Sequence, residues 1–127
     1  MKSFSLSWRR SVKARKQRKF VYNAPLHIRH NFLSLNLSKE LRKKYGMRNL
    51  SPRKGDSVRV VKGSFKNKNG KIERIMLKEM RIFVAGIENT RKDGAKSLCP
   101  LKPNALQITE LVLDDKKRQK AINRVRS

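Results

Sequence analysis

The sequence predicts a mainly β protein: a small barrel with an extended basic arm before it and a helical tail after it. Short apolar segments separated by turn residues fill the stretch from Ser57 to Val112, as in a small barrel of four or five strands. No Asp or Glu precedes Glu40, although Lys and Arg are frequent there, so this part is too highly charged to build a core. A length of 127 residues fits one domain with extensions. We therefore expect an arm at residues 1–50, a barrel at 51–113 and a tail at 114–127.

The arm shows neither a helical nor a strand-like periodicity across residues 1–37. We therefore expect an irregular segment that becomes ordered on the surface of a partner. Pro25 biases Ala24 toward an extended conformation and breaks the segment. Three aromatic residues interleave with the basic ones and could either stack on unpaired bases or pack against the rest of the protein: Trp8, Phe20 and Tyr22.

A short helix is predicted at residues 38–45. Ser38 is a suitable N-cap, Glu40 lies in the first turn, and Leu41 and Tyr45 share one face. Gly46 is expected to end the helix, because glycine readily adopts the left-handed C-cap conformation.

The strands of the barrel are predicted from alternating apolar residues, with an Asp93-Gly94 hairpin turn between two of them. Hydrophobic residues make up 37% of the chain and concentrate after Val58, so we expect a small core confined to the second half. The expected strands contain Val58 and Val60; Ile72 and Ile75; Ile82, Val84 and Ile87; and Leu106, Ile108 and Val112.

The tail is predicted to be a helix that forms when it docks on the rest of the protein. Asp114 and Asp115 can cap its N-terminus, and a weak apolar face of Ala121, Ile122 and Val125 lies among basic residues.

The charge of the chain predicts a polyanionic partner. Thirty-four Lys and Arg against 9 Asp and Glu give a formal net charge of +25, which is too unbalanced for an ordinary mixed surface and attracts phosphate. RNA binding would therefore weaken steeply with salt.

Other classes of function find little support. His27 and His30 lack a third clustered ligand, so RNA contact or packing is favoured over a metal site. Cys99 is the single cysteine, which excludes an internal disulfide and suits a reducing compartment. We find no catalytic triad, paired carboxylates or P-loop, and no apolar run of membrane-spanning length. We expect a soluble protein that is not an enzyme and has no cofactor, no small-molecule substrate and no membrane partner.

The strongest candidate site is a basic loop with glycines between two strands. Glycine allows a close approach of phosphate and lysines supply point charges. The alternative is a hairpin whose glycines serve only the turn and whose lysines keep an edge soluble. The loop residues are Lys62, Gly63, Lys66, Lys68, Gly70 and Lys71.

The stretch from Gly55 to Gly63, with Gly70-Lys71-Ile72, resembles the KOW motif. Further segments make the match closer: Asn23-Ala24-Pro25-Leu26-His27-Ile28-Arg29, Leu37-Ser38-Lys39-Glu40-Leu41-Arg42 with Lys44-Tyr45, Arg53-Lys54, Pro103 and Ile108-Thr109. Together they are similar to the universal large-subunit ribosomal protein twenty-four in its eukaryotic and archaeal form, numbered twenty-six in the older eukaryotic naming. The resemblance covers about Arg15 to Arg118.

This resemblance implies an SH3-like barrel that binds large-subunit ribosomal RNA near the exit of the nascent-chain tunnel, beside other large-subunit proteins, and supports assembly. It implies a cytoplasmic protein, with passage through the nucleolus if the source is eukaryotic. The residues that it assigns to RNA are Arg15, Lys16, Arg18, Lys19, Asn23, Pro25, His27 and Arg29 in the arm, and Lys62, Gly63, Lys66, Gly70 and Lys71 in the loop. The basic composition adds Arg9, Arg10, Lys13, His30 and Lys68 as further candidates.

Two departures from the family pattern concern the loop and the C-terminus. Asn67 stands where the family usually has glycine, and asparagine tolerates the left-handed conformation that the turn needs. The chain ends at Ser127, where many eukaryotic relatives carry a longer basic tail. The alternative functions are a KOW-type transcription-elongation factor and a general nucleic-acid-binding protein.

Overall fold

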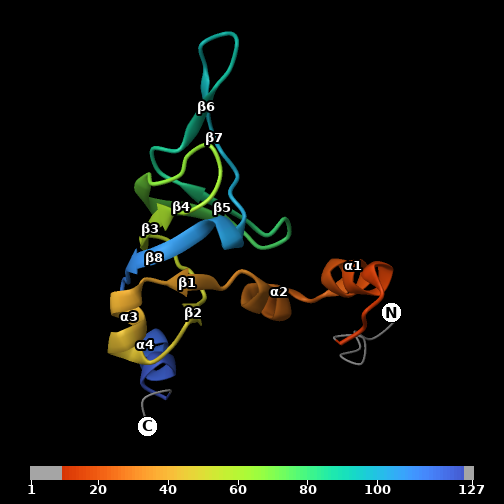
Figure 1. The fold of residues 1–127 in the computed structure, drawn as a ribbon, viewed down its shortest axis with the longest axis vertical. Helices are drawn as coiled ribbons and strands as arrows, with labels where there is room; N and C mark the ends of the chain where they lie inside the picture. Colours follow the sequence, from red (N-terminus) through yellow and green to blue (C-terminus); the bar gives the residue numbers. More distant parts are fainter. Residues whose placement is uncertain (1–9, 125–127) are drawn as a thin grey trace.

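The computed structural model describes residues 10–124, which form a sheet with helices at its ends and a helical arm (Figure 1). The main sheet has six strands in the order β2-β1-β8-β3-β4-β5, and β6 and β7 form a separate hairpin. The strands are β1 Leu35–Leu37, β2 Asn49–Leu50, β3 Ser57–Val60, β4 Asn69–Met76, β5 Arg81–Val84, β6 Glu88–Thr90, β7 Lys96–Leu98 and β8 Leu106–Glu110. The helices are α1 Ala14–Asn23, α2 Leu26–Phe32, α3 Lys39–Tyr45 and α4 Lys116–Asn123, with a 3₁₀ turn at Pro103–Ala105.

The expected strands after Ser57 are confirmed as β3, β4, β5 and β8, although Val112 lies beyond the end of β8 and Ile87 beyond the end of β5. Neighbouring pairs are antiparallel except β1 with β8, which is parallel. Register shifts at Ser57/Val58 and at Ile72/Arg74 mark bulges, which bend strands and increase their twist. Among residues 10–124 the pairings run from β2 to β5 without joining these two edges, so a closed barrel is not formed by them.

Two expectations about the first half of the chain were wrong. The fold is mixed rather than mainly β, because the segment expected to be irregular forms α1 and α2. The core is not confined to the second half either, since Leu33, Leu35 and Leu37 are at most 1% exposed. They belong to one cluster with the apolar residues of the other strands, so residues 33–50 are part of the folded body.

The short helix and the hairpin turn follow the predicted local chemistry. Ser38 caps α3 by accepting a hydrogen bond from the Leu41 N–H, and Gly46 ends the helix at φ +68°. In the β6–β7 hairpin, Gly94 has φ +86° and the Asp93 carboxylate accepts from the Ala95 N–H at 3.0 Å. The hairpin projects from the body of the molecule (Figure 1).

The predicted C-terminal helix is confirmed as α4, with Asp115 as its N-cap. Its Ile122 is 2% exposed and its Arg118 is 5% exposed, so α4 is docked on the body; Val125 lies outside the described residues. The Lys117 N–H bound to the Asp115 carboxylate, together with Arg53 at 2.5 Å, holds the pKa of that carboxyl below its usual value.

Candidate nucleic-acid interface

Helix α1 presents a cationic stripe that ends in an aromatic ring. Arg15, Arg18, Lys19 and Tyr22 follow the spacing i, i+3, i+4, i+7, which places them on one helical face, and all four are exposed. Tyr22 is 80% exposed. The opposite side holds Phe20, which is 8% exposed. We call Arg15, Arg18, Lys19 and Tyr22 the α1 stripe.

The charges of α1 lower the stability of its helical conformation. It has no acidic residue in its first turn and no side-chain hydrogen bond at its N-cap, Lys13. Positive charge near a helix N-terminus opposes the helix dipole, and Arg15 and Lys19 are a like-charged pair at i, i+4. An anion bound along the stripe would relieve both effects, so this helix suits a polyanionic partner.

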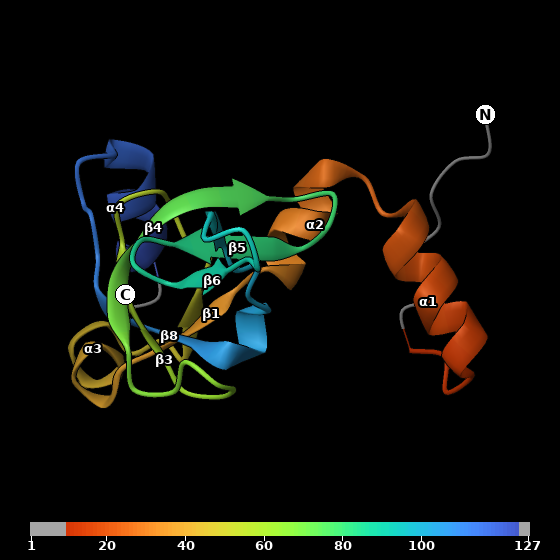
Figure 2. The ribbon, with the colours of Figure 1, turned by 90° about the horizontal axis from the view of Figure 1, so that it is seen from above.

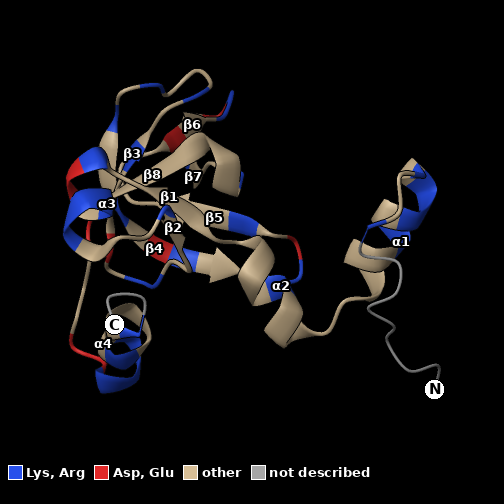
Figure 3. Cartoon of the chain, turned by 60° about the horizontal axis from the view of Figure 1, so that its bottom comes forward, with Lys and Arg blue, Asp and Glu red and all other residues tan. Residues whose placement is uncertain are grey.

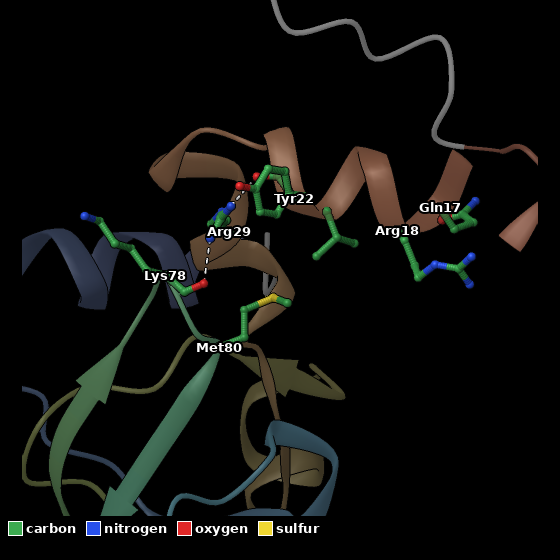
Figure 4. A pocket seen from close by; sticks show the side chains of 7 residues that line it. Gln17, Arg18, Tyr22, Arg29, Lys78 and Met80 are labelled. Carbon is green, nitrogen blue, oxygen red and sulfur yellow. Dashed lines mark hydrogen bonds between the residues drawn. The ribbon is translucent and has the colours of Figure 1, made fainter. Parts of the chain in front are cut away.

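Among the residues that the structure describes, two contacts connect α1 to the body of the protein. The Phe20 ring packs on Phe32 of α2, with ring centroids 5.8 Å apart. The guanidinium of Arg29 donates to three backbone carbonyls: to Ala24 at 2.9 Å, to Lys78 at 2.6 Å and to Tyr22. Figure 4 shows Arg29 between the end of α1 and the turn that carries Lys78. We call these three hydrogen bonds the Arg29 clamp.

The clamp gives Arg29 a structural contact that the sequence did not predict. Three of its N–H groups donate to carbonyl groups of the protein itself, and its assignment to RNA stays a prediction. The other arm candidates are more open: Arg10, Lys13, Asn23, His27 and His30 are exposed, and Lys16 and Pro25 are partly buried. Arg9 lies outside the described residues.

The loop between β3 and β4 is an ordered turn with exposed lysines. Phe65 packs against the core cluster, and the Asn67 N–H donates to the Val60 carbonyl at 2.8 Å. Gly63 has φ +97° and Asn67 has φ +69°, so the expectation that asparagine would tolerate the left-handed conformation is confirmed. Three of the candidate lysines are exposed on this loop: Lys62, Lys66 and Lys68.

Gly70 and Lys71 lie in β4 rather than in the turn. Gly70 pairs with Val58 and Lys71 pairs with Ser57. A Cβ at Gly70 would come within 2.5 Å of the Ala85 carbonyl oxygen, so the glycine is required by strand packing. The expectation that Gly70 serves the turn was therefore wrong, whereas Lys71 is exposed on the strand.

The structure does not gather the candidates into one patch. Figures 1 and 2 show α1 projecting away from the sheet, whereas the β3–β4 loop lies on the body. Lys and Arg are also spread over α3 and α4, with acidic residues at fewer places (Figure 3). Within residues 10–124 the candidate interface therefore consists of two basic regions separated in space, which suits a partner larger than either.

One polar cluster escaped the sequence analysis. Asp56 is fully buried and accepts two hydrogen bonds from Arg118, at 2.8 and 2.6 Å, and one each from the N–H groups of Arg53 and Val112. Arg118 also donates to the carbonyls of Val112 and Ser51. No sequence signal paired these residues, because 62 positions separate them.

A shallow hollow of about 430 Å³ lies between α1 and the β4–β5 turn. Residues of both elements and of the Arg29 clamp line it (Figure 4). Within residues 10–124, no group of three or more His, Cys, Asp and Glu is placed to hold a metal ion. No helix in this same range is long and apolar enough to cross a membrane.

Comparison with known proteins identifies the family. The model of the family that unites the eukaryotic ribosomal proteins L26 with their archaeal counterparts, numbered twenty-four, matches residues 11–125. The large ribosomal subunit protein uL24 of Methanosphaera stadtmanae is 45% identical over 114 residues, which cover 90% of this chain and 97% of that protein. The match includes the arm, the sheet and α4. The chain therefore belongs to this family of eukaryotic and archaeal ribosomal proteins.

Proposed function

We propose that this protein is a structural constituent of the large ribosomal subunit. It binds large-subunit ribosomal RNA near the polypeptide exit tunnel, beside neighbouring large-subunit proteins, and supports subunit assembly and translation. The observation that carries the proposal is the family match over residues 11–125, and the protein from Methanosphaera stadtmanae bears a large-subunit name. It acts in the cytoplasm as part of the ribosome, after passage through the nucleolus if the source is eukaryotic.

In the proposed mechanism, the two basic regions neutralise phosphates of different RNA segments. The α1 stripe supplies two guanidinium groups, which can fork onto phosphate oxygens, and the β3–β4 loop supplies lysines on a fixed turn. The Arg29 clamp sets the direction in which α1 leaves the sheet. The arm thus reaches RNA at a distance from the body. Because α1 is already helical, binding does not have to order this segment, and the entropic cost of binding is lower.

In this proposal the protein acts only by binding RNA and neighbouring proteins, and it catalyses no reaction. We further propose that residues 51–113 have the SH3-like curvature of a KOW domain. The two bulges and the close contact at Gly70 support this, because bulges and glycines let a sheet curl toward closure.

A KOW-type transcription-elongation factor is the alternative function. Such factors usually carry a separate α/β domain before the module. Here the strands that precede residue 51 are β1 and β2, and both belong to the main sheet. A general nucleic-acid condenser would explain the charge but not the family match over the arm and α3.

The first test is a high-salt sucrose gradient of cell lysate, with each fraction probed for this protein. The proposal predicts a peak that stays with large subunits and polysomes after the salt wash. A peak in light fractions would contradict the proposal and favour the transcription factor, and so would complete stripping by the wash.

The role of the arm has its own test. Reversing Arg15, Arg18 and Lys19 to Glu should impair incorporation into large subunits while the body stays folded. The matched control reverses three exposed residues of the β6–β7 hairpin, Arg91, Lys92 and Lys96, which changes the net charge equally. Normal incorporation of the arm variant, or equal impairment of both variants, would contradict a specific role of the stripe.

A further inference from the structure

The hollow between α1 and the β4–β5 turn shares Arg18 with the phosphate contacts proposed above, but its apolar lining has no role in them. It is lined on the α1 side by Arg18, Val21 and Tyr22, and on the turn side by Lys78 and Met80. Figure 4 shows Tyr22 and Met80 on opposite sides, with Arg29 closing one end. We propose that this hollow receives one unstacked nucleotide of RNA. The inference rests on the proposed RNA-binding function and specifies how a single-stranded or bulged position would be recognised.

The size and lining of the hollow suit a nucleobase. Its volume of about 430 Å³ falls within the range of roughly 300–1,000 Å³ that is usual for small-ligand sites. Val21, Met80 and the ring of Tyr22 offer apolar and aromatic surface, on which splayed-out bases of RNA stack. An 80% exposed tyrosine at the end of a basic helix is available for such a stack without unfolding any core contact.

The charges around the hollow suit the phosphates that flank such a base. Arg18 and Lys78 are exposed and come from the two opposite walls. The third cation, Arg29, is occupied by three carbonyl groups and holds the two walls together. A cationic rim around an apolar floor is complementary to a nucleotide, whose base is apolar on its faces and whose phosphate is anionic.

The backbone at Met80 supplies an independent observation. Met80 has φ +51°, a left-handed conformation that costs an L-residue with a side chain about 1–2 kcal/mol. Glycine or asparagine would fit this turn position with less strain. Residues held in such conformations concentrate at ligand-binding sites. The Met80 side chain lines the hollow and packs partly against the core cluster, so the strained turn places an apolar side chain at the hollow.

The experiment compares two RNA duplexes that differ at one position, using the full-length protein at moderate salt. In the first duplex a 2-aminopurine is bulged, and in the second it is paired with an added uridine in the opposite strand. We expect tighter binding of the bulged duplex and a change in 2-aminopurine fluorescence on binding. Tyr22→Ala should weaken binding of the bulged duplex roughly 5- to 150-fold, as for loss of one base–aromatic stack. It should weaken binding of the paired duplex less, so that the preference for the bulged duplex falls.

Two further variants separate stacking from folding. Tyr22→Phe keeps the ring and should retain both the preference and the fluorescence change. Met80→Asn tolerates the left-handed backbone but removes the thioether, so it should lower the preference for the bulged duplex while the far-ultraviolet circular dichroism is unchanged.

The outcomes distinguish this inference from the proposed function. Equal binding of the two duplexes, or an unchanged preference in Tyr22→Ala, would overturn the nucleotide site while leaving RNA binding by the protein intact. Failure of the wild type to bind either duplex at low salt would contradict the proposed function itself. A photoreactive benzoylphenylalanine at position 22 should cross-link to ribosomal RNA in large subunits, and cross-links to protein alone would overturn the nucleotide site.

Discussion

The fully buried carboxylate of Asp56 is satisfied by groups from three places in the chain. Its partners are the guanidinium of Arg118 and the N–H groups of Arg53 and Val112. A buried ion pair gains little over apolar packing when both partners are present, but removal of one partner leaves a charge buried without compensation. The pair therefore fixes where α4 docks, because α4 alone supplies the cation.

Arg118→Met should lower the free energy of unfolding by about 3–5 kcal/mol, because Asp56 then lies buried opposite an apolar side chain. Urea denaturation of the RNA-free protein measures the change. The matched control is Lys117→Met, on the exposed side of α4, which should stay within about 0.5 kcal/mol. Equal stability of the two variants would show that the ion pair does not hold α4.

Single residues also show which contacts can be predicted from the sequence and which cannot. Ser38, Gly46, Asp93 and Gly94 act within a few positions of themselves, so local chemistry predicted them correctly. Arg29 could not be predicted in this way. One of its three partners, the Lys78 carbonyl, lies 49 positions away, and no pattern in one sequence tells a guanidinium that binds phosphate from one that binds the backbone.

Among the elements, α1 was missed for a physical reason. Apolar periodicity finds helices that bury a face, and α1 buries little besides Phe20. The useful signal was the spacing of the basic residues at 15, 18 and 19 and of the tyrosine at 22, which is helical although the face is mostly polar. The strands were found more easily because their apolar residues are fully buried, as at Val58, Val60 and Ile108. The strand pairings had to come from the structure.

Because the charges of α1 oppose its helix, Arg15→Glu should affect folding and binding in opposite directions. An acid in the first turn favours the helix dipole, so the helix-to-coil ratio of residues 14–23 should rise about two- to fivefold, measured by Cα chemical shifts. RNA affinity should fall and the salt slope should decrease by about 1, as for loss of one phosphate contact. Arg15→Gln serves as the neutral control. A rise in both helicity and affinity would contradict the phosphate role.

Docking of α4 should depend on pH through its N-cap. The Lys117 N–H and Arg53 lower the pKa of Asp115 in the folded state. A lowered pKa means that the carboxylate stabilises the fold above the unfolded pKa of about 3.9. This contribution is lost as the pH falls through the folded value. The protection factors of the α4 amides against hydrogen exchange should therefore fall below about pH 4 in the wild type, and less so in Asp115→Asn. Identical pH profiles would exclude Asp115 as the cause.

At the scale of the whole molecule, the sheet combines residues from before and after the expected arm–barrel boundary at residue 51. β1 lies between β2 and β8, and its residues Leu35 and Leu37 are fully buried. α1 instead contacts the body mainly through Phe20 and the Arg29 clamp. The molecule thus consists of one folded body that begins near Leu33 and a helical arm attached to it.

Two truncations test this division. Deletion of residues 2–24 should remove the α1 stripe and change Tm by less than about 5 °C, since none of residues 10–24 belongs to the core cluster. A fragment that starts at residue 51 should not fold, because it lacks Leu33, Leu35 and Leu37. Each buried leucine contributes about 2–5 kcal/mol, and the sum for the three is comparable to the whole free energy of unfolding of a typical domain, about 5–15 kcal/mol.

The dispersion of amide resonances distinguishes the two fragments. A well-dispersed spectrum from the shorter fragment would show that residues 51–113 form an independent barrel, whereas a collapsed spectrum from the longer one would make α1 part of the body.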